Sequence, residues 1–143
     1  EMGINLGLGT DGASSNNNLN FMEEIHLATM VNKGYNFDPG FMSTKEILKM
    51  ATINGAKSQG RENCGSLKMG NQADFIVVDM NKSHLQPIYD YLGNIIYSAQ
   101  ASDICLSVVD GEIIYKDGEL TNIDEEKVIY QCNKSRDRIL SEL

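Results

Sequence analysis

The first sixty residues open with a strand pattern. Small and apolar residues fill positions 4–10 and predict a buried strand that starts almost at the beginning of the sequence. The acid Asp11 follows it directly, and a loop of small and polar residues at 12–18 leads towards a helix. A carboxylate at the end of a strand is well placed to bind a metal ion or to take up a proton.

Two helices are predicted after this loop, each with its own start signal. Asn20 and Glu23 stand three residues apart and predict a capped N-terminus for the first helix. The helix is expected to end near Lys33-Gly34, because glycine favours helix termination. The residues predicted to share its buried face are Met22, Ile25 and Thr29.

The second helix follows a turn at Asp38-Pro39-Gly40, whose residue types favour a reversal of the chain. Ser43 and Glu46 form a capping box, and the helix behind them is expected to run to about Ser58. Its predicted inward face is mostly small, so close packing on a neighbouring element is expected. This face comprises Leu48, Ala51, Gly55 and Ala56.

Beyond residue 60 the pattern becomes β-rich. The run 73–79 predicts a buried strand that follows glycine-containing turns. Two apolar runs, 104–109 and 112–116, flank Asp110-Gly111 and predict a hairpin with a type I′ turn. A further turn is predicted at 116–119.

A last helix is predicted near the end of the sequence. Asp124 is its expected N-cap, and Glu125 and Glu126 in the first turn complement the helix dipole. Its apolar side is predicted to comprise Val128, Cys132, Ile139 and Leu143. The chain therefore divides into a helical part, 1–60, and a β-rich part, 61–143, with no internal repeat.

Composition limits the classes of partner and location. Of the 143 residues 41% are hydrophobic, which suits one domain or one piece of a larger one. A net charge of −8 argues against nucleic acid and anionic membrane surfaces, and no apolar run is long enough to span a bilayer. Three widely spaced cysteines indicate structural thiols and a cytoplasmic location. The first residue is Glu rather than Met, so we expect a piece of a larger protein.

Asp11 is the leading candidate for chemistry, as a metal ligand or a proton acceptor. The alternative is a turn aspartate that caps its own backbone, and the local pattern leaves both open. His26 on a helix and His84 in a loop before Pro87 are too few and too far apart for a histidine-rich metal site. Ser14 lacks a nucleophile-elbow pattern and a nearby histidine, which argues against a serine nucleophile.

Several stretches also resemble motifs of one known family, in the expected order. Residues 8–19 (Leu-Gly-Thr-Asp-Gly-Ala-Ser-Ser-Asn-Asn-Asn-Leu) resemble the last metal-ligand motif of the amidohydrolase superfamily, in its deaminase and chlorohydrolase branch. Residues 51–57 are similar to that branch's helix after the last barrel strand, and residues 65–79 to its return into a β-sandwich. Residues 109–115 fit the same tail. Within the branch, the Ser-Asn-Asn-Asn run at 15–18 and residues 84–99 look most like 5-methylthioadenosine/S-adenosylhomocysteine deaminases.

The resemblance implies an α/β fold. It assigns residues 1–60 to the C-terminal part of a (β/α)8 metal-dependent hydrolase barrel, as its last strand and following helices. Residues 61–143 would form the C-terminal share of a small β-sandwich, a connecting segment and a C-terminal helix.

The resemblance also implies a mononuclear zinc or iron site held by a His-x-His pair, two further histidines and an aspartate. That aspartate corresponds to Asp11, which would coordinate the metal weakly or accept a proton from the attacking water. The implied reaction is hydrolytic deamination or dechlorination of an aromatic nitrogen heterocycle, with an adenosine-type nucleoside favoured. Ammonia or chloride would leave.

In that family the histidines and a catalytic glutamate belong to segments upstream of residue 1. We therefore expect the chain by itself to be inactive and to bind no zinc or iron tightly, since one carboxylate cannot hold the ion. The incomplete barrel would leave Leu6, Leu8 and the inner helix faces uncovered, so a homo-oligomer formed through that surface, or partial disorder there, is expected. The alternative is a standalone binding or interaction module that kept the sandwich and lost the enzyme.

Overall fold

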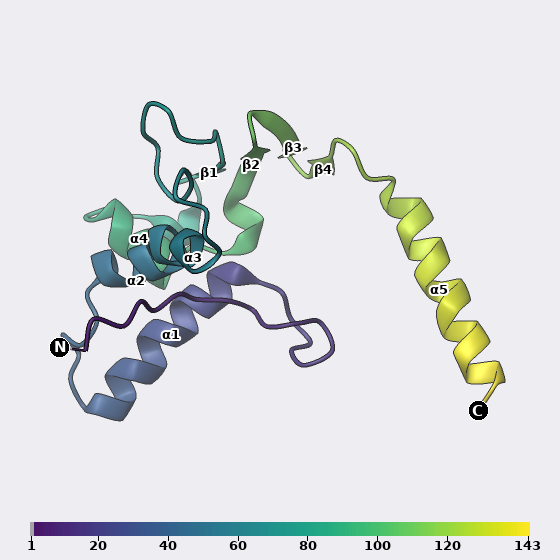
Figure 1. Cartoon of the computed structure of the whole chain (residues 1–143), viewed down its shortest axis with the longest axis horizontal. Helices are drawn as coiled ribbons and strands as arrows, with labels where there is room; N and C mark the ends of the chain where they lie inside the picture. The colour runs from purple at the N-terminus through teal and green to yellow at the C-terminus, as the bar shows by residue number, and fades with distance from the viewer. Residues whose placement is uncertain (1) are drawn as a thin grey trace.

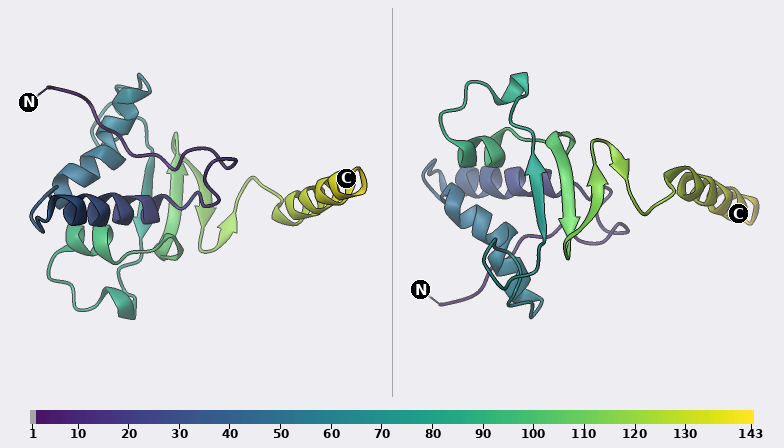
Figure 2. Two further views of the ribbon diagram at one scale, coloured as in Figure 1. Left: turned by 90° about the horizontal axis from the view of Figure 1, so that it is seen from below. Right: turned by 90° about the horizontal axis from the view of Figure 1, so that it is seen from above.

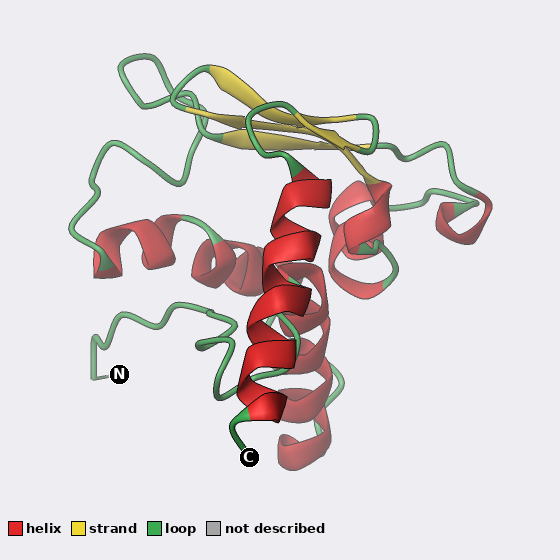
Figure 3. Cartoon of the chain, turned by 90° about the vertical axis from the view of Figure 1, so that its right-hand side faces the viewer, coloured by secondary structure: helices red, strands yellow, loops and turns green. Residues whose placement is uncertain are grey.

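The computed structural model describes residues 2–143 as a layer of helices beside one antiparallel sheet (Figures 1 and 3). The helices are α1 (Phe21–Asn36), α2 (Thr44–Ala51), α3 (Ile53–Ser58), α4 (Tyr91–Tyr97) and α5 (Glu125–Ser141). The strands are β1 (Phe75–Val78), β2 (Ile104–Val109), β3 (Glu112–Lys116) and β4 (Glu119–Leu120). Two 3-10 turns, η1 (Ser83–Leu85) and η2 (Ala101–Asp103), flank α4.

The strand predicted at 4–10 is wrong for the described residues, where this segment is irregular. Its backbone bonds to the helices instead of to a strand ladder. The amide of Leu8 donates to the Met50 carbonyl (3.1 Å), and the Asn54 side chain donates to the Leu6 carbonyl (2.9 Å). A strand exists only beside another strand that shares its hydrogen bonds, and no described strand lies next to this segment.

Helix α1 confirms the predicted start and the predicted buried face. The Asn20 side chain accepts a hydrogen bond from the Glu23 amide (3.4 Å), and Met22, Ile25 and Thr29 are buried. The helix continues past the predicted stop to Asn36 and ends at Phe37, which has a left-handed backbone.

The single helix predicted from Ser43 to Ser58 is wrong, because Thr52 interrupts it with φ −130° and ψ −92°. The Thr52 hydroxyl donates to the carbonyl of Leu48 (2.6 Å), a local bond that competes with regular helix geometry. The capping box is confirmed, since the Ser43 amide donates to the Glu46 carboxylate (2.7 Å). The predicted inward face is confirmed in part: Ala51, Gly55 and Ala56 are half-buried and Gly7 packs closely on Gly55, but Leu48 is 37% exposed and the fully buried residue is Ile47.

The helical core lies where α1, α2 and α4 meet. Its buried members are Met22, Ile25, Ile47 and Ile96. Burial of such aliphatic side chains is the main favourable term in folding. The loop after α3 packs closely against Ile53 at Gly65. Only glycine fits there, because a Cβ at this position would lie 2.8 Å from the Ile53 Cα.

The sheet has the order β1-β2-β3-β4, with each neighbouring pair antiparallel. The predicted hairpin is confirmed, and Asp110 (φ 51°) and Gly111 (φ 81°) have the left-handed backbone of a type I′ turn. The turn predicted at 116–119 is also present. Strand β1 lies within the predicted run but is not buried, since its central residues Ile76 and Val77 are exposed at the sheet edge.

Helix α5 stands away from the rest of the molecule (Figures 1 and 2). The predicted cap is confirmed, because the Asp124 side chain accepts a hydrogen bond from the Lys127 amide (2.9 Å). None of its residues is buried, so its apolar side, including Val128 and Ile139, faces solvent. The homo-oligomer expected from the uncovered Leu6 and Leu8 stays a prediction. No helix among the described residues combines the length and apolar character needed to cross a membrane.

His84 joins the two 3-10 turns through a buried carboxylate. Its Nε2 lies 2.8 Å from an oxygen of Asp103, whose side chain is 3% exposed. The same oxygen accepts a hydrogen bond from the Gln100 amide (2.8 Å). Burial acts to raise the pKa of Asp103, but this amide bond, together with the hydrogen bond and charge of His84, outweighs it and lowers the pKa.

Asp103 is expected to make the stability of the chain sensitive to acid. Because its pKa is lower in the folded than in the unfolded chain, its contribution is present above its ordinary pKa of 3.8 and is lost as the pH falls through the lower folded value. Asp103→Asn should lower the urea midpoint at pH 6, and the gap to the parent chain should close below pH 3.8. Asp137→Asn on exposed α5 serves as the control. If the difference in urea midpoint between Asp103→Asn and the parent chain were the same at every pH, the lowered pKa of Asp103 would not be its cause.

Candidate functional site

Asp11 lies at the end of the irregular segment with an exposed side chain. Its backbone is left-handed (φ 60°), a conformation that aspartate tolerates better than most residues. One carboxylate oxygen, Oδ1, accepts a hydrogen bond from the Gly12 amide (2.7 Å), the kind of local bond that the turn interpretation foresaw. Within the described residues no hydrogen bond is made by Oδ2, which leaves this oxygen for a ligand or a proton.

The loop after Asp11 is tied back onto the segment and onto α1 by asparagine side chains. Asn16 donates through Nδ2 to the Thr10 carbonyl (2.9 Å) and to the Glu24 carboxylate (3.2 Å). Asn18 accepts through Oδ1 from the Asn20 amide (2.8 Å). Sequence reasoning missed these roles, and the run of three asparagines was the available signal.

The other sequence candidates lie away from this loop end. His26 lines a shallow hollow of about 310 Å³ with Glu23, Tyr97 and Gln100, and His84 belongs to the pair with Asp103. Neither is hydrogen-bonded to Asp11. All three cysteines are free thiols; Cys64 is buried and Cys105 half-buried, whereas Cys132 is exposed and does not fit the predicted structural role.

A wider groove of about 760 Å³ runs between α2, α3 and β1. Its walls are largely apolar, with Leu8, Phe21 and Phe75 among them, and Asp11 is not part of it. The groove therefore lacks the acid that the sequence singled out.

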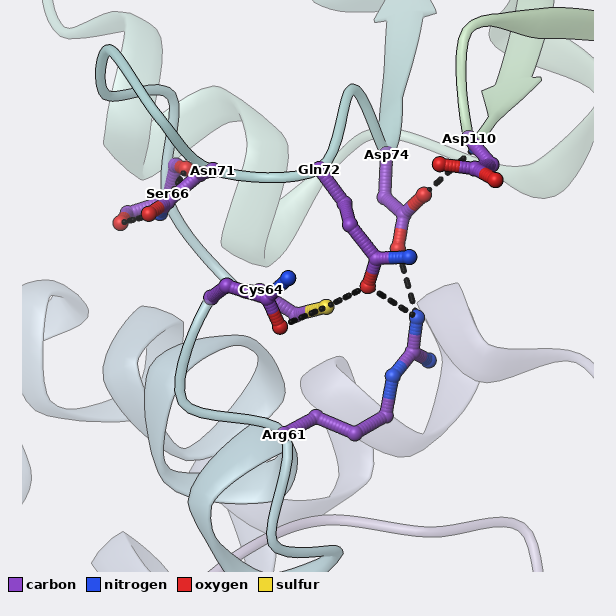
Figure 4. A network of polar contacts seen from close by, with 8 residues as sticks. Arg61, Cys64, Ser66, Asn71, Gln72, Asp74 and Asp110 are labelled. Atoms are coloured by element: carbon purple, nitrogen blue, oxygen red, sulfur yellow. Dashed lines mark hydrogen bonds and ion pairs between the residues drawn. The ribbon is translucent and has the colours of Figure 1, made fainter.

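Beside this groove, a polar network fixes the loop between α3 and β1 (Figure 4). Arg61 pairs with Asp74 (2.9 Å) and donates to Gln72 (3.2 Å), while the Cys64 thiol also contacts Gln72. The other oxygen of Asp74 accepts from the Asp110 amide (2.7 Å). That bond is the main reason that the pKa of Asp74 is lowered, and the network links the helical layer to the hairpin.

Asp11 fits a metal ion only as one ligand among several. Among residues 2–143 no three His, Cys, Asp or Glu side chains gather to hold an ion. A carboxylate oxygen is nonetheless a normal ligand for zinc, alongside histidine nitrogens. The donor set therefore allows Asp11 to complete a site whose other ligands come from elsewhere.

Comparison with protein families places these features among related sequences. A model described as the amidohydrolase family matches residues 1–114. A 5-methylthioadenosine/S-adenosylhomocysteine deaminase of Acetivibrio thermocellus is 47% identical over 96% of this chain and 32% of its own length. A 5'-deoxyadenosine deaminase of Methanosarcina barkeri is 40% identical over 99% of this chain and 32% of its own length. The chain thus spans about a third of these relatives.

Solved structures of zinc-containing proteins share the fold. An adenosine deaminase from Xanthomonas campestris with bound zinc gives a TM-score of 0.92 at 30% identity, over 96% of this chain and 32% of that one. The zinc complex of atrazine chlorohydrolase from Arthrobacter aurescens gives a TM-score of 0.83 at 26% identity, over 92% and 30%. The arrangement of helices and sheet described above therefore recurs within larger hydrolases.

Proposed function

The chain belongs to the amidohydrolase family, and on that premise we propose that it supplies the Asp11-bearing part of a metal-dependent hydrolytic deaminase. The observation that carries the proposal is the similarity to deaminases over nearly the whole chain. Their names share one substrate class, the adenosine-type nucleosides. We therefore propose such a nucleoside as the substrate and ammonia as the leaving group, with chlorinated heterocycles as the alternative suggested by the chlorohydrolase.

The proposal also assigns the two layers to parts of the enzyme. Residues 1–60 would belong to a (β/α)8 barrel and residues 61–143 to a β-sandwich with its C-terminal helix. All four strands follow α3, which supports this division, while α4 from the second part packs back against α1 and α2. The segment 4–10 would become a barrel strand only beside a neighbouring strand, which is the partner it needs for a ladder.

In this role Asp11, at the end of segment 4–10, accepts and then releases a proton. Zinc or iron, when bound, would supply Lewis-acid activation of the attacking water. Asp11 Oδ2 would lie at the site as a weak ligand or take the proton from that water, while the Gly12 amide holds the carboxylate through Oδ1. The water oxygen bonds to the ring carbon, the carbon–nitrogen bond breaks, and the proton held at Oδ2 leaves with the departing ammonia.

A chimeric enzyme tests the proposed function. The matching third of the Acetivibrio thermocellus deaminase is replaced by this chain, the chimera is loaded with zinc, and ammonia release from 5'-deoxyadenosine and 5-methylthioadenosine is measured. We expect steady ammonia release from the chimera and none from the chain by itself. A folded, zinc-loaded chimera that releases no ammonia would reject the proposal and favour a non-catalytic module. Release of chloride from a chlorotriazine, with no nucleoside turnover, would point to the dechlorinating alternative.

A further inference from the structure

Asn16 occupies the position between Asp11 and helix α1. Its half-buried side chain donates two hydrogen bonds through Nδ2, one to the Thr10 carbonyl (2.9 Å) and one to the Glu24 carboxylate (3.2 Å). We propose that Asn16 is a positioning residue that fixes where the Asp11 carboxylate points. The inference rests on the proposed function of Asp11 and adds a second residue to it.

The bond to Thr10 acts directly on the backbone of Asp11. The Thr10 carbonyl belongs to the planar peptide that joins Thr10 to Asp11, so a bond to its oxygen limits rotation of that peptide. The Cα of Asp11 lies at the other end of the same plane. By limiting rotation of this peptide, Asn16 helps to fix the position of the Asp11 Cα, to which the side chain is attached.

The bond to Glu24 gives this arrangement a rigid support. Glu24 lies in the first turn of α1, a helix whose buried face belongs to the core. A hydrogen bond to a carboxylate is stronger than one between neutral groups. Asn16 thus transmits the position of α1 to the peptide that carries Asp11.

The loop itself is folded so that Asn16 can reach back. The amides of Ser15 and Asn16 both donate to the Gly12 carbonyl at 2.9 Å, which closes a tight turn immediately after Asp11. Asp11 itself is exposed and its carboxylate is hydrogen-bonded only to the adjacent Gly12 amide among the described residues. The other hydrogen bonds to Asp11 come from its neighbours Thr10 and Gly12, so the asparagine bridge is what ties this part of the loop to α1.

The chemistry of the bridge requires an amide side chain. Two acceptors, the Thr10 carbonyl and the Glu24 carboxylate, face Nδ2, and the Asn18 amide donates to Oδ1 (3.3 Å). An aspartate at position 16 has nearly the same shape but presents oxygen to both acceptors. Asn16→Asp therefore breaks the bridge with little change in volume. Asn17→Asp is the matched control, because Asn17 is exposed and makes no side-chain hydrogen bond within residues 2–143.

Amide hydrogen exchange of the chain tests the bridge without any activity measurement. In Asn16→Asp the exchange rate of the Gly12 amide, which is bonded to Asp11, should rise about threefold to tenfold, as expected for the loss of one or two hydrogen bonds. In Asn17→Asp it should stay unchanged. Equal exchange in the two variants would overturn the proposed positioning role.

Kinetics of the chimeric deaminase test whether the effect passes through Asp11. Asn16→Asp should lower kcat about tenfold to a hundredfold with KM nearly unchanged, as for a misplaced reacting group. In an Asp11→Asn background the same change should cause no further loss, since a residue that acts through another loses its effect with it. If Asn16→Asp lowered kcat by the same factor in the Asp11→Asn background as in the parent chimera, the two residues would act independently. That result would overturn the proposal even though the parent chimera is active. A parent chimera without activity would reject the proposed function only, and the exchange comparison would still decide the role of Asn16.

Discussion

Replacing Asp11 by asparagine is expected to lower kcat for ammonia release in the chimeric deaminase by about 10²- to 10⁴-fold, the usual contribution of a positioned acid or base. Asparagine keeps the shape, tolerates the left-handed backbone and still accepts from the Gly12 amide. It cannot take up a proton at the position of Oδ2 and is a poorer metal ligand. The loss should therefore fall on the chemical step, measured as kcat, while the fold and KM stay close to the parent values.

A matched control is available in another turn of the molecule. Asp117 also has a left-handed backbone (φ 49°), also precedes a glycine and is also exposed, but it lies in the turn between β3 and β4. Asp117→Asn should leave kcat unchanged. If Asp11→Asn behaved like Asp117→Asn, Asp11 would be the turn aspartate of the alternative interpretation, without a part in the reaction.

Replacing Ile47 by alanine is expected to destabilise the chain by about 2–5 kcal/mol, the range for truncation of a buried aliphatic side chain. Ile47 is fully buried, and α1 and α4 both pack against the helix that carries it. Truncation removes apolar burial and leaves a space that three helices would have to close. Urea unfolding should show a lower midpoint with a nearly unchanged slope.

The neighbouring residue is the control for this change. Leu48 is 37% exposed, and Leu48→Ala should lower the free energy of unfolding by less than about 1.5 kcal/mol. The reason is that Leu48 has less apolar surface buried in the fold than Ile47, so its truncation removes less buried surface. Larger destabilisation by Leu48→Ala than by Ile47→Ala would contradict the packing described here. It would instead support the inward face that the hydrophobic pattern first indicated.

The elements that the sequence predicted well are those determined by local chemistry. The caps at Asn20, Ser43 and Asp124 and the Asp110-Gly111 turn all depend on residues a few positions apart. Such contacts form within one segment, so a short window of sequence contains the whole cause.

The elements that the sequence predicted poorly depend on distant partners. The segment 4–10 has the composition of a strand, but a ladder requires a second strand. The break at Thr52 changes which side of the helix faces the core, so a pattern that assumed one continuous helix selected Leu48 in place of Ile47. Periodicity gives the spacing of an inward face but not its rotation about the axis once the helix is interrupted.

The candidate site likewise has one part that local sequence predicts and one part that depends on the folded chain. Asp11 is found from its place after an apolar run and from its motif, because both are features of the sequence order. The bridge from Asn16 to Thr10 and Glu24 is visible only once the loop is folded, since it joins positions six and eight residues apart through a tight turn. Its role could not be read from a run of similar asparagines, of which Asn17 makes no such bond within residues 2–143.

Helix α5 has a thermodynamic consequence for this chain. None of its seventeen residues is buried, so its unfolding exposes little surface that is coupled to the core around Ile47. Helices of this length are only marginally stable in water when nothing packs against them. The chain therefore contains two melting units, and loss of helical signal in α5 can precede the cooperative transition of the remaining structure.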